Sequence, residues 1–135
     1  MAAVLTILVN KKTQENQMSM VHMYGIPNCD TVRKARKWMD ASGLDYAFHD
    51  YKKEGVDEGD LARWADRCGW EVLLNRRGTT FRKLSDADKA DMTRDKAIAL
   101  MLQHPSMIKR PVLETEDGAR VLVGFAESEW ENLLC

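Results

Sequence analysis

The stretch YGIPNCDTVRK, residues 24–34, joins an extended run to a helix through a tight turn that carries one cysteine. Gly25 and Pro27 break the extended run, and a helical pattern follows. Asn28 is a favourable N-cap residue for that helix. We therefore expect Cys29 to lie where backbone N–H groups are free and the helix dipole favours negative charge. A thiolate, the reactive form of cysteine, is stabilised in such a place.

The charged neighbours of Cys29 act on that thiolate in opposite directions. Arg33 and Lys34 lie about one helical turn further on and add positive charge, which favours the thiolate. The adjacent Asp30 disfavours it, because a like charge nearby opposes ionisation. The alternative is a small apolar residue that packs under the sheet. From the residues alone, a reactive and a structural cysteine are equally compatible with this position.

The segments on either side of the turn predict two strands joined by a helix. A short strand is expected over residues 21–24 and a second, aromatic-rich strand over residues 46–51. The helix between them ends at Gly43. Its inward side recurs at helical spacing: Val32, Ala35, Met39 and Ser42. A strand, a helix and a strand in this order predict parallel strands with a right-handed crossover.

Beyond the second strand, the pattern predicts helices and then a hairpin. Helices are expected over residues 57–69, from Ser85 onward, and over residues 93–104. Residues 111–115 and 120–123 flank a Glu-Asp-Gly turn and predict an antiparallel hairpin, which a terminal helix follows. This order predicts an α/β fold of thioredoxin-like type, with a mixed four-stranded sheet and helices on its faces.

The chain length of 135 residues suits one domain with one core. We assign residues 20–135 to that domain. Residues 1–19 differ from it, because a short apolar run is followed by a polar, linker-like run. Three interpretations of them stay open: a leader, an extra strand at a sheet edge, or an arm that docks on a second copy.

Composition narrows the class of protein. The net charge of −1 gives no overall field toward nucleic acid or a membrane, and no apolar run is long enough to span a bilayer. Three cysteines without disulfide-framework spacing predict reduced thiols and a cytoplasmic protein. We expect neither nucleic acid nor membrane as a partner, and a monomer or weak dimer.

The other thiols and the histidines suggest structural roles. Val32 stands three residues after Cys29, so no Cys-x-x-Cys disulfide can form and any turnover needs an outside or distant thiol. Cys68 falls on an apolar helix face, which favours a buried core thiol, whereas Cys135 is a frayed-end thiol or a resolving cysteine. The cysteines and the histidines (His22, His49 and His104) show no zinc spacing, so we expect no metal and no bound cofactor.

A second informative stretch is IKRPV, residues 108–112. An Arg-Pro pair directly before a strand is the expected position of a turn held by a cis proline. Such a turn would aim Arg110 at the end of the sheet near Cys29, with a planar fork of donors suited to oxyanions and carboxylates. The alternative is a solvated arginine beside Lys109.

Three stretches carry a resemblance to a known family: YGIPNCDTVRKA (24–35), LLNRRGTTFRKL (73–84) and MLQHPSMIKRPVL (101–113). The first and third resemble the arsenate reductase (ArsC) family, and the second is most similar to its YffB subgroup. The likeness covers residues 20–134. It implies a thioredoxin-like fold with a helical insertion and a nucleophilic Cys29 that attacks an oxidised substrate. It also implies glutathione as electron donor, with glutaredoxin resolving the mixed disulfide.

The resemblance carries over only in part. Cys29 matches the family's nucleophile and Arg110 its substrate-binding arginine, directly before Pro111. At two further oxyanion arginines of arsenate reductases this chain has Asn75, with Arg76 beside it, and Gly124. The family's histidine before the cysteine is Gly25 here, and its serine after the cysteine is Val32. Fewer cationic donors would leave a tetrahedral oxyanion poorly neutralised, which favours a thiol substrate over arsenate.

These observations lead to a predicted glutathione-dependent monothiol reductase. Cys29 and Arg110 are the predicted catalytic residues. The predicted substrate- or glutathione-binding residues are Asn28, Arg33, Asn75, Arg76 and Pro111. The substrate would be a glutathione mixed disulfide or an arsenate-like oxyanion. The basic stretch 75–83, which we expect to be a loop, would hold glutathione carboxylates or remain solvated. The alternatives are an Spx-type regulator that binds RNA polymerase and a nucleic-acid binder, which the near-neutral charge disfavours.

Overall fold

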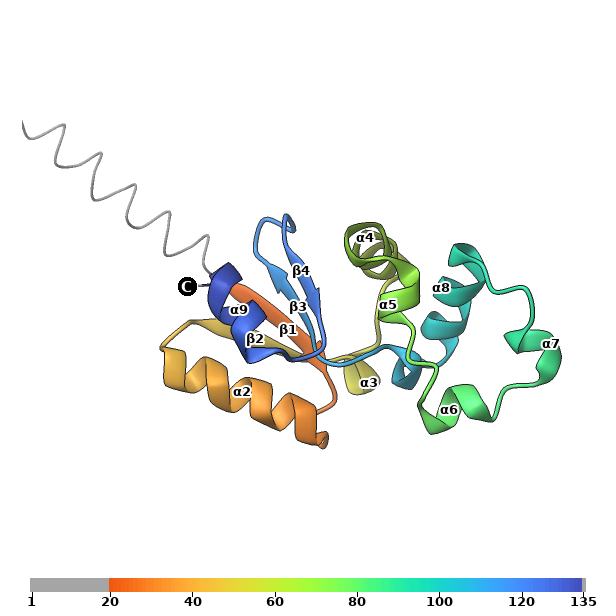
Figure 1. Cartoon of the computed structure of the whole chain (residues 1–135), viewed down its shortest axis with the longest axis horizontal. Helices are drawn as coiled ribbons and strands as arrows, with labels where there is room; N and C mark the ends of the chain where they lie inside the picture. The colour runs from red at the N-terminus through yellow and green to blue at the C-terminus, as the bar shows by residue number, and fades with distance from the viewer. Residues whose placement is uncertain (1–19, 135) are drawn as a thin grey trace, which may run out of the picture.

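The computed structural model describes residues 20–134 (Figure 1). Its centre is a four-stranded sheet in the order β2-β1-β3-β4. β1 (Val21–Gly25) pairs in parallel with β2 (Tyr46–Asp50) and antiparallel with β3 (Val112–Thr115), which pairs antiparallel with β4 (Val121–Val123). The predicted mixed thioredoxin-like sheet is therefore confirmed. The interpretations of residues 1–19, and that of Cys135, fall outside the described residues.

One face of the sheet is covered by α2 (Asp30–Ser42) and α9 (Glu127–Leu134). Because successive strand residues point to opposite faces, Val21 and Met23 of β1 both enter this core. Trp130 of α9 is fully buried there and meets Phe125 edge-on, with ring centroids 4.8 Å apart. The predicted inward side of α2 is correct except for Ser42, which is exposed because it lies in the final turn.

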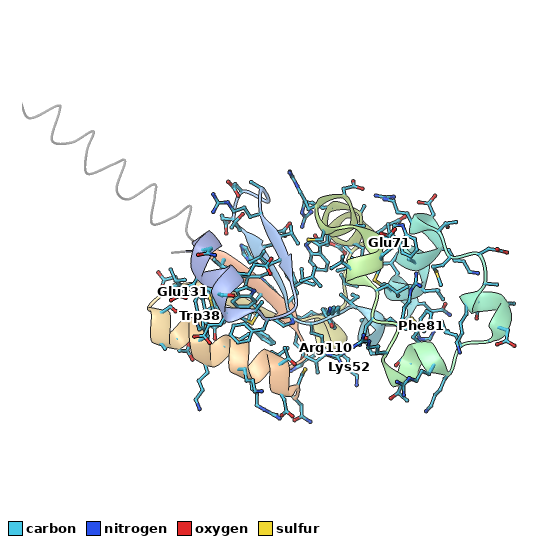
Figure 2. All side chains as sticks on the ribbon, viewed as in Figure 1. Trp38, Lys52, Glu71, Phe81, Arg110 and Glu131 are labelled. Carbon is cyan, nitrogen blue, oxygen red and sulfur yellow. The ribbon has the colours of Figure 1, made fainter. Side chains whose placement is uncertain are left out.

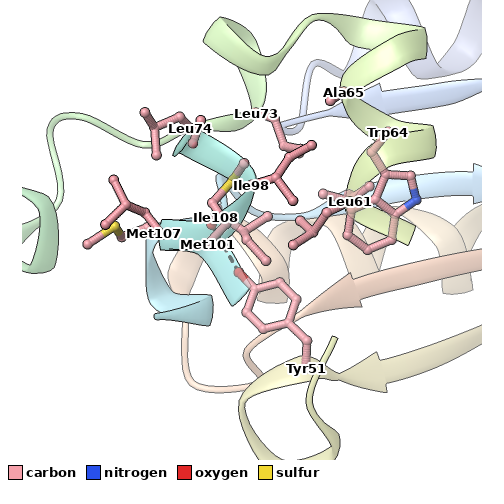
Figure 3. Close-up of a cluster of buried hydrophobic side chains, with 13 residues drawn as sticks. Tyr51, Leu61, Trp64, Ala65, Leu73, Leu74, Ile98, Met101, Met107 and Ile108 are labelled. Atoms are coloured by element: carbon pink, nitrogen blue, oxygen red, sulfur yellow. Dashed lines mark hydrogen bonds between the residues drawn. The ribbon is translucent and has the colours of Figure 1, made fainter. Parts of the chain in front are cut away.

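The chain between β2 and β3 forms a helical insertion beside the sheet (Figure 1). It contains α3 (Tyr51–Glu54), α4 (Glu58–Cys68), α5 (Trp70–Leu73), α6 (Thr79–Arg82), α7 (Asp86–Lys89), α8 (Arg94–Gln103) and a 3-10 turn, η1 (Pro105–Met107). Its apolar core gathers side chains of α4, α5, α8 and η1 around Tyr51, as Figure 3 shows. The predicted helices over 57–69 and 93–104 and the start at Ser85 are confirmed.

Three boundary predictions are wrong. The N-cap of α2 is Cys29 and not Asn28, because the Cys29 carbonyl already accepts the Arg33 N–H at 2.9 Å. The second strand ends at Asp50, whose carboxylate accepts the N–H groups of Lys52 and Lys53 and starts α3 at Tyr51. The basic stretch 75–83 is not all loop, since it contains α6.

Backbone hydrogen bonds join the end of α5 to the segment that leads into β3. Leu74 and Ile108 form an isolated antiparallel bridge, with Asn75 N–H donating to the Met107 carbonyl and Lys109 N–H to the Leu73 carbonyl, each at 2.8 Å. The chain then passes through a cis Arg110–Pro111 bond into β3. This confirms the cis proline that the sequence predicts.

The other face of the sheet is polar where α4 crosses it. Glu114 of β3 is only 4% exposed, and Arg63 of α4 donates to its two carboxylate oxygens at 2.5 and 2.8 Å. His22 and His49 lie on neighbouring strands with ring nitrogens 2.9 Å apart, and Glu116 lies 2.5 Å from the second nitrogen of His22. Charge pairing therefore helps to hold the insertion against the sheet. Within residues 20–134, no helix combines the length and apolar character needed to cross a membrane.

Candidate active site

Cys29 lies just beyond the carboxyl end of β1 and caps the N-terminus of α2. Its backbone is extended (φ −135°, ψ 130°), so its thiol stands beside the unpaired N–H groups of the first helical turn. Gly25 lets the first turn of α2 pack closely against the end of β1. A Cβ atom at residue 25 would stand 3.0 Å from Cγ2 of Val32, a buried residue in the first turn of α2.

The pKa of the Cys29 thiol lies below its usual value. Burial of the half-buried side chain raises it, but hydrogen bonds from the Val32 N–H, the Arg110 side chain and the Thr31 N–H together outweigh burial. The positive charge of Arg110 lowers the pKa further. Helix N–H groups and one cation therefore favour the thiolate, as expected for a reactive cysteine.

Arg110 is the cation that reaches the thiol. Its positive charge lowers the pKa of the Cys29 thiol, while Nη1 donates to the Ser106 carbonyl at 3.2 Å. The side chain is half-buried, and Figure 2 shows it where the sheet meets the helical insertion. Burial lowers the pKa of Arg110, but the neighbouring Tyr51 and Cys29 outweigh this and raise it. The structure thus brings together the two residues that the sequence predicts to be catalytic.

Tyr51 completes the cluster, and the sequence reasoning missed it. The ring is buried, the hydroxyl donates to the Ile108 carbonyl at 3.0 Å, and burial raises the pKa of Tyr51 although the charge of Arg110 opposes that rise. A usable signal existed, because Tyr51 is the last residue of the strand predicted over residues 46–51, which should run parallel to β1. Parallel neighbours bring their carboxyl ends to one edge of the sheet, so the end of the second strand lies at the same edge as Cys29.

Asn28 and Arg33 flank the thiol but contact each other. The Arg33 guanidinium donates to the Asn28 side-chain oxygen at 3.0 Å and forms an ion pair with Asp30. All three side chains are exposed. Asp30, which the sequence predicts to oppose the Cys29 thiolate, therefore has its charge balanced by Arg33.

Asn75 and Arg76 belong to the turn after α5. The Asn75 side-chain oxygen accepts the Arg77 N–H at 3.2 Å, so it shapes the turn. The exposed Arg76 lies over the Trp70 ring, 5.6 Å from its centroid. This turn contacts the segment before Arg110 through the Asn75–Met107 hydrogen bond.

Pro111 and Gly124 lie side by side at the other flank of Arg110. The Pro111 carbonyl accepts the Gly124 N–H at 2.8 Å. The Lys109 side chain lies beside Gly124, since its Cε would stand 3.6 Å from a Cβ at residue 124. The Lys109 side chain is exposed, so one flexible cation lies at the position where the family resemblance places an arginine.

The second described thiol lies elsewhere. Cys68 ends α4 and donates from Sγ to the Val121 carbonyl at 3.0 Å. Burial raises its pKa, and Glu129 adds to that effect. Among residues 20–134, no group of three or more His, Cys, Asp or Glu side chains is arranged to hold a metal ion.

Comparison with known proteins places this geometry in a family context. The model of the ArsC family matches residues 24–133. The solved structure of a YffB protein is 53% identical with a TM-score of 0.81, and the match covers 85% of this chain and 99% of that one. The solution structure of an arsenate reductase (ArsC) related protein from Brucella melitensis is 51% identical with a TM-score of 0.67, over 84% of this chain and 93% of that one.

Two further proteins are similar to this chain in sequence. An uncharacterized protein of Haemophilus influenzae is 38% identical over 112 residues, which are 83% of this chain and 96% of that protein. Global transcriptional regulator Spx 1 of Lactococcus lactis is 26% identical over 112 residues, which are 82% of this chain and 85% of that protein. The names of similar proteins therefore include both an arsenate reductase related protein and a transcriptional regulator.

Proposed function

Since this chain belongs to the ArsC family, we propose that it is a glutathione-dependent monothiol reductase with Cys29 as nucleophile. The observation that carries the proposal is the half-buried thiol at the N-terminus of α2, whose pKa is lowered by backbone N–H groups and by Arg110 despite burial. A thiolate near neutral pH is what nucleophilic attack on oxidised sulfur requires.

The proposed cycle exchanges disulfides in two steps. The Cys29 thiolate attacks the glutathione sulfur of a mixed disulfide, a new sulfur–sulfur bond forms, and the other thiol leaves as a thiolate. A second glutathione thiolate then attacks the Cys29 adduct, which releases oxidised glutathione and restores the Cys29 thiolate. The proton of the second glutathione passes to the thiolate released in the first step. Over the cycle the mixed disulfide gains two electrons, and the protein returns to its starting state. Val32 stands three residues after Cys29, so the resolving thiol must come from outside this turn.

The donors that remain on Arg110 favour a substrate with a small anionic group. A guanidinium has five N–H donors. One of those of Arg110 is used by the Ser106 carbonyl. The remaining donors can bind one carboxylate or one oxidised sulfur group. Asn75 and Gly124 add no charge, so a tetrahedral oxyanion such as arsenate is the weaker candidate.

Arg76 is our proposed contact for a glutathione carboxylate. It is exposed, and its turn is hydrogen-bonded to the segment that carries Arg110. Arg33 is a weaker candidate, because Asp30 and Asn28 already occupy its guanidinium. Glutaredoxin would be an alternative partner for releasing the adduct.

The test is adduct formation followed by turnover. Incubation with oxidised glutathione should add one glutathione to Cys29, and reduced glutathione should remove it, as followed by peptide mass spectrometry. Cys68→Ser should keep the adduct and the turnover of a glutathione mixed disulfide, whereas Cys29→Ser should lose both. An adduct on Cys68 in place of Cys29, or no turnover by the wild-type protein, would overturn the proposal.

A regulator is the second candidate, because Spx 1 of Lactococcus lactis is similar over most of its length. A protein of that kind would bind RNA polymerase and would need no turnover of a small substrate. Purified RNA polymerase retained by the immobilised chain, equally with wild type and Cys29→Ser, would favour this reading. Turnover without such binding would favour the reductase.

A further inference from the structure

We propose that Thr80 is a positioning residue for Arg110 and acts through Ser106. The hydroxyl oxygens of Thr80 and Ser106 are hydrogen-bonded at 2.8 Å, and the Ser106 carbonyl accepts a hydrogen bond from Arg110 Nη1 at 3.2 Å. This role rests on the proposed function, since Arg110 is the proposed ligand of the anionic substrate. It also gives the basic stretch 75–83 a function besides holding carboxylates.

The Ser106 carbonyl is the backbone acceptor that orients Arg110. Ser106 lies in η1, four residues before Arg110. An arginine side chain is long and has many rotamers, and a half-buried cation needs hydrogen-bond acceptors. The position of the Arg110 guanidinium therefore depends on where η1 holds this carbonyl.

The place of η1 depends on its neighbours, because it is only three residues long. The hydrogen bonds within it join residues three apart, so they set its shape and not its place. The basic stretch holds it from outside at two points. The Asn75 N–H donates to the Met107 carbonyl at 2.8 Å, and the Thr80 hydroxyl reaches the Ser106 side chain.

A tight turn carries Thr80 back to η1. It starts at Asn75, whose side-chain oxygen accepts the Arg77 N–H at 3.2 Å. Gly78 closes the turn, since a Cβ there would stand 3.0 Å from Nδ2 of Asn75. The next residue begins α6, where the Arg82 N–H donates to the Gly78 carbonyl at 3.1 Å. The chain from Asn75 to Thr80 is therefore compact and bonded to η1 at both ends.

The hydroxyl pair is partly withdrawn from water, because Thr80 and Ser106 are both half-buried. Replacing one hydroxyl by a methyl group would leave the other without this partner, which costs free energy in a half-buried place. Ser106 should then be held less firmly, and its carbonyl with it. The Arg110 guanidinium should spend more time away from that carbonyl.

The first test is the rate at which phenylglyoxal modifies Arg110, followed by peptide mass spectrometry, which needs no glutathione. Phenylglyoxal bonds to the terminal nitrogens of a guanidinium, so an Nη1 held by a carbonyl should react slowly. Thr80→Val keeps the branched shape and removes the hydroxyl. It should speed the modification of Arg110 by about three- to fivefold, as expected for the loss of one hydrogen bond.

Arg33 is the internal reference in the same samples, because it is exposed and paired with Asp30 on α2. Its rate should not change in Thr80→Val. An unchanged rate of Arg110 would overturn the inference. A parallel rise in the rates of Arg33 and Arg110 would mean that the whole protein opens more often, and would also overturn it.

Two matched controls separate the hydroxyl from packing. Thr80→Ser keeps the hydroxyl and removes the methyl group, so Arg110 should be modified at the wild-type rate. Thr79→Val makes the same substitution one residue away, at an exposed position of α6, and should also leave the rate unchanged. A faster rate in either control would overturn the inference.

A double-variant cycle tests whether the effect of Thr80 passes through Ser106. Ser106→Ala should speed the modification of Arg110 as much as Thr80→Val does. The variant with both changes should be no faster than either single one, because both remove the same hydrogen bond. Effects that multiply in the double variant would overturn the inference.

Turnover distinguishes this role from the proposed function. With a glutathione mixed disulfide, Thr80→Val should raise KM by about three- to fivefold and change kcat less, since a loosely held Arg110 binds the substrate anion less well. Failure of the wild-type protein to turn over this substrate would overturn the proposed function, whereas the phenylglyoxal rates would still decide the role of Thr80.

Discussion

Cys29 and Cys68 are both half-buried thiols at helix ends, yet their environments are opposite. Cys29 caps the N-terminus of α2, where free N–H groups and Arg110 lower its pKa despite burial. Cys68 is the last residue of α4, where burial and Glu129 raise its pKa and the thiol donates its proton to the Val121 carbonyl. Partial burial alone therefore does not decide reactivity; the end of the helix and the nearest charge do.

Alkylation of the wild-type protein should show the largest difference between the two thiols. Near neutral pH we expect iodoacetamide to modify Cys29 about 10 to 100 times faster than Cys68, because only Cys29 is stabilised as a thiolate. Peptide mass spectrometry over time gives both rates in one sample and separates them from that of Cys135. Equal rates would remove the basis for treating Cys29 as the nucleophile.

Removal of the Arg110 cation should make the pKa and alkylation rate of Cys29 more like those of Cys68. Arg110→Ala takes away one hydrogen bond and one positive charge, so the pKa of Cys29 should rise and alkylation near neutral pH should slow by about tenfold. Arg33→Ala is the control, since that guanidinium is already paired with Asp30. A pKa of Cys29 that stays in place in Arg110→Ala would show that the helix N–H groups suffice.

A glycine substitution tests whether Cys29 depends on close packing of α2 against β1. Gly25→Ala would place a Cβ 3.0 Å from Val32 Cγ2, so we expect a loss of about 1 to 2 kcal/mol in the free energy of unfolding, together with slower Cys29 alkylation. Gly59→Ala is the matched control in α4, because a Cβ there meets no atom within 4 Å. It should gain about 0.5 to 1 kcal/mol. Urea unfolding measures both, and similar values for the two variants would contradict the packing argument.

The smallest expected effect is on stability as a function of pH. The lowered pKa of Cys29 means that its stabilisation is present above the ordinary thiol pKa and is lost as pH falls through the lowered one. The raised pKa of Cys68 has the opposite sign, so its contribution is present below the ordinary pKa and is lost as pH rises through the raised one.

Melting temperatures between about pH 6 and about pH 10 would measure this effect. Relative to wild type, Cys29→Ser should be least stable at the alkaline end, whereas Cys68→Ser should gain there. Differences from wild type that stay constant with pH in both variants would contradict the assignment of the two pKa shifts.

The local features of the site could be predicted from the sequence. Gly25 and Pro27 mark the turn, the period of Val32, Ala35 and Met39 marks the helix, and their order places Cys29 between a strand and a helix start. The cap itself was predicted one residue too early, at Asn28, because side-chain preference does not reveal where the first helical carbonyl bond begins. These features depend on neighbours in the chain, whose geometry is set by local backbone preferences.

Other residues were predicted correctly in position but not in their contacts. Asn28 and Arg33 lie beside Cys29, yet they bond each other and Asp30. Asn75 shapes its own turn. Sequence spacing shows which polar groups are near, but it does not show which of them are already paired.

The sequence by itself determined the strand-turn-helix around Cys29, the mixed sheet and the turn at Arg110–Pro111, since each depends on short-range pattern. Only the tertiary structure decided that Arg110, Cys29 and Tyr51 lie close enough for their charges to shift one another's pKa. That meeting requires β1 and β2 to run in parallel, so that Cys29 and Tyr51 emerge at one edge of the sheet. It also requires β3 to pair antiparallel with β1, since Arg110 lies two residues before the start of β3. Contacts between segments far apart in the chain depend on how whole elements pack, and no local pattern encodes that packing.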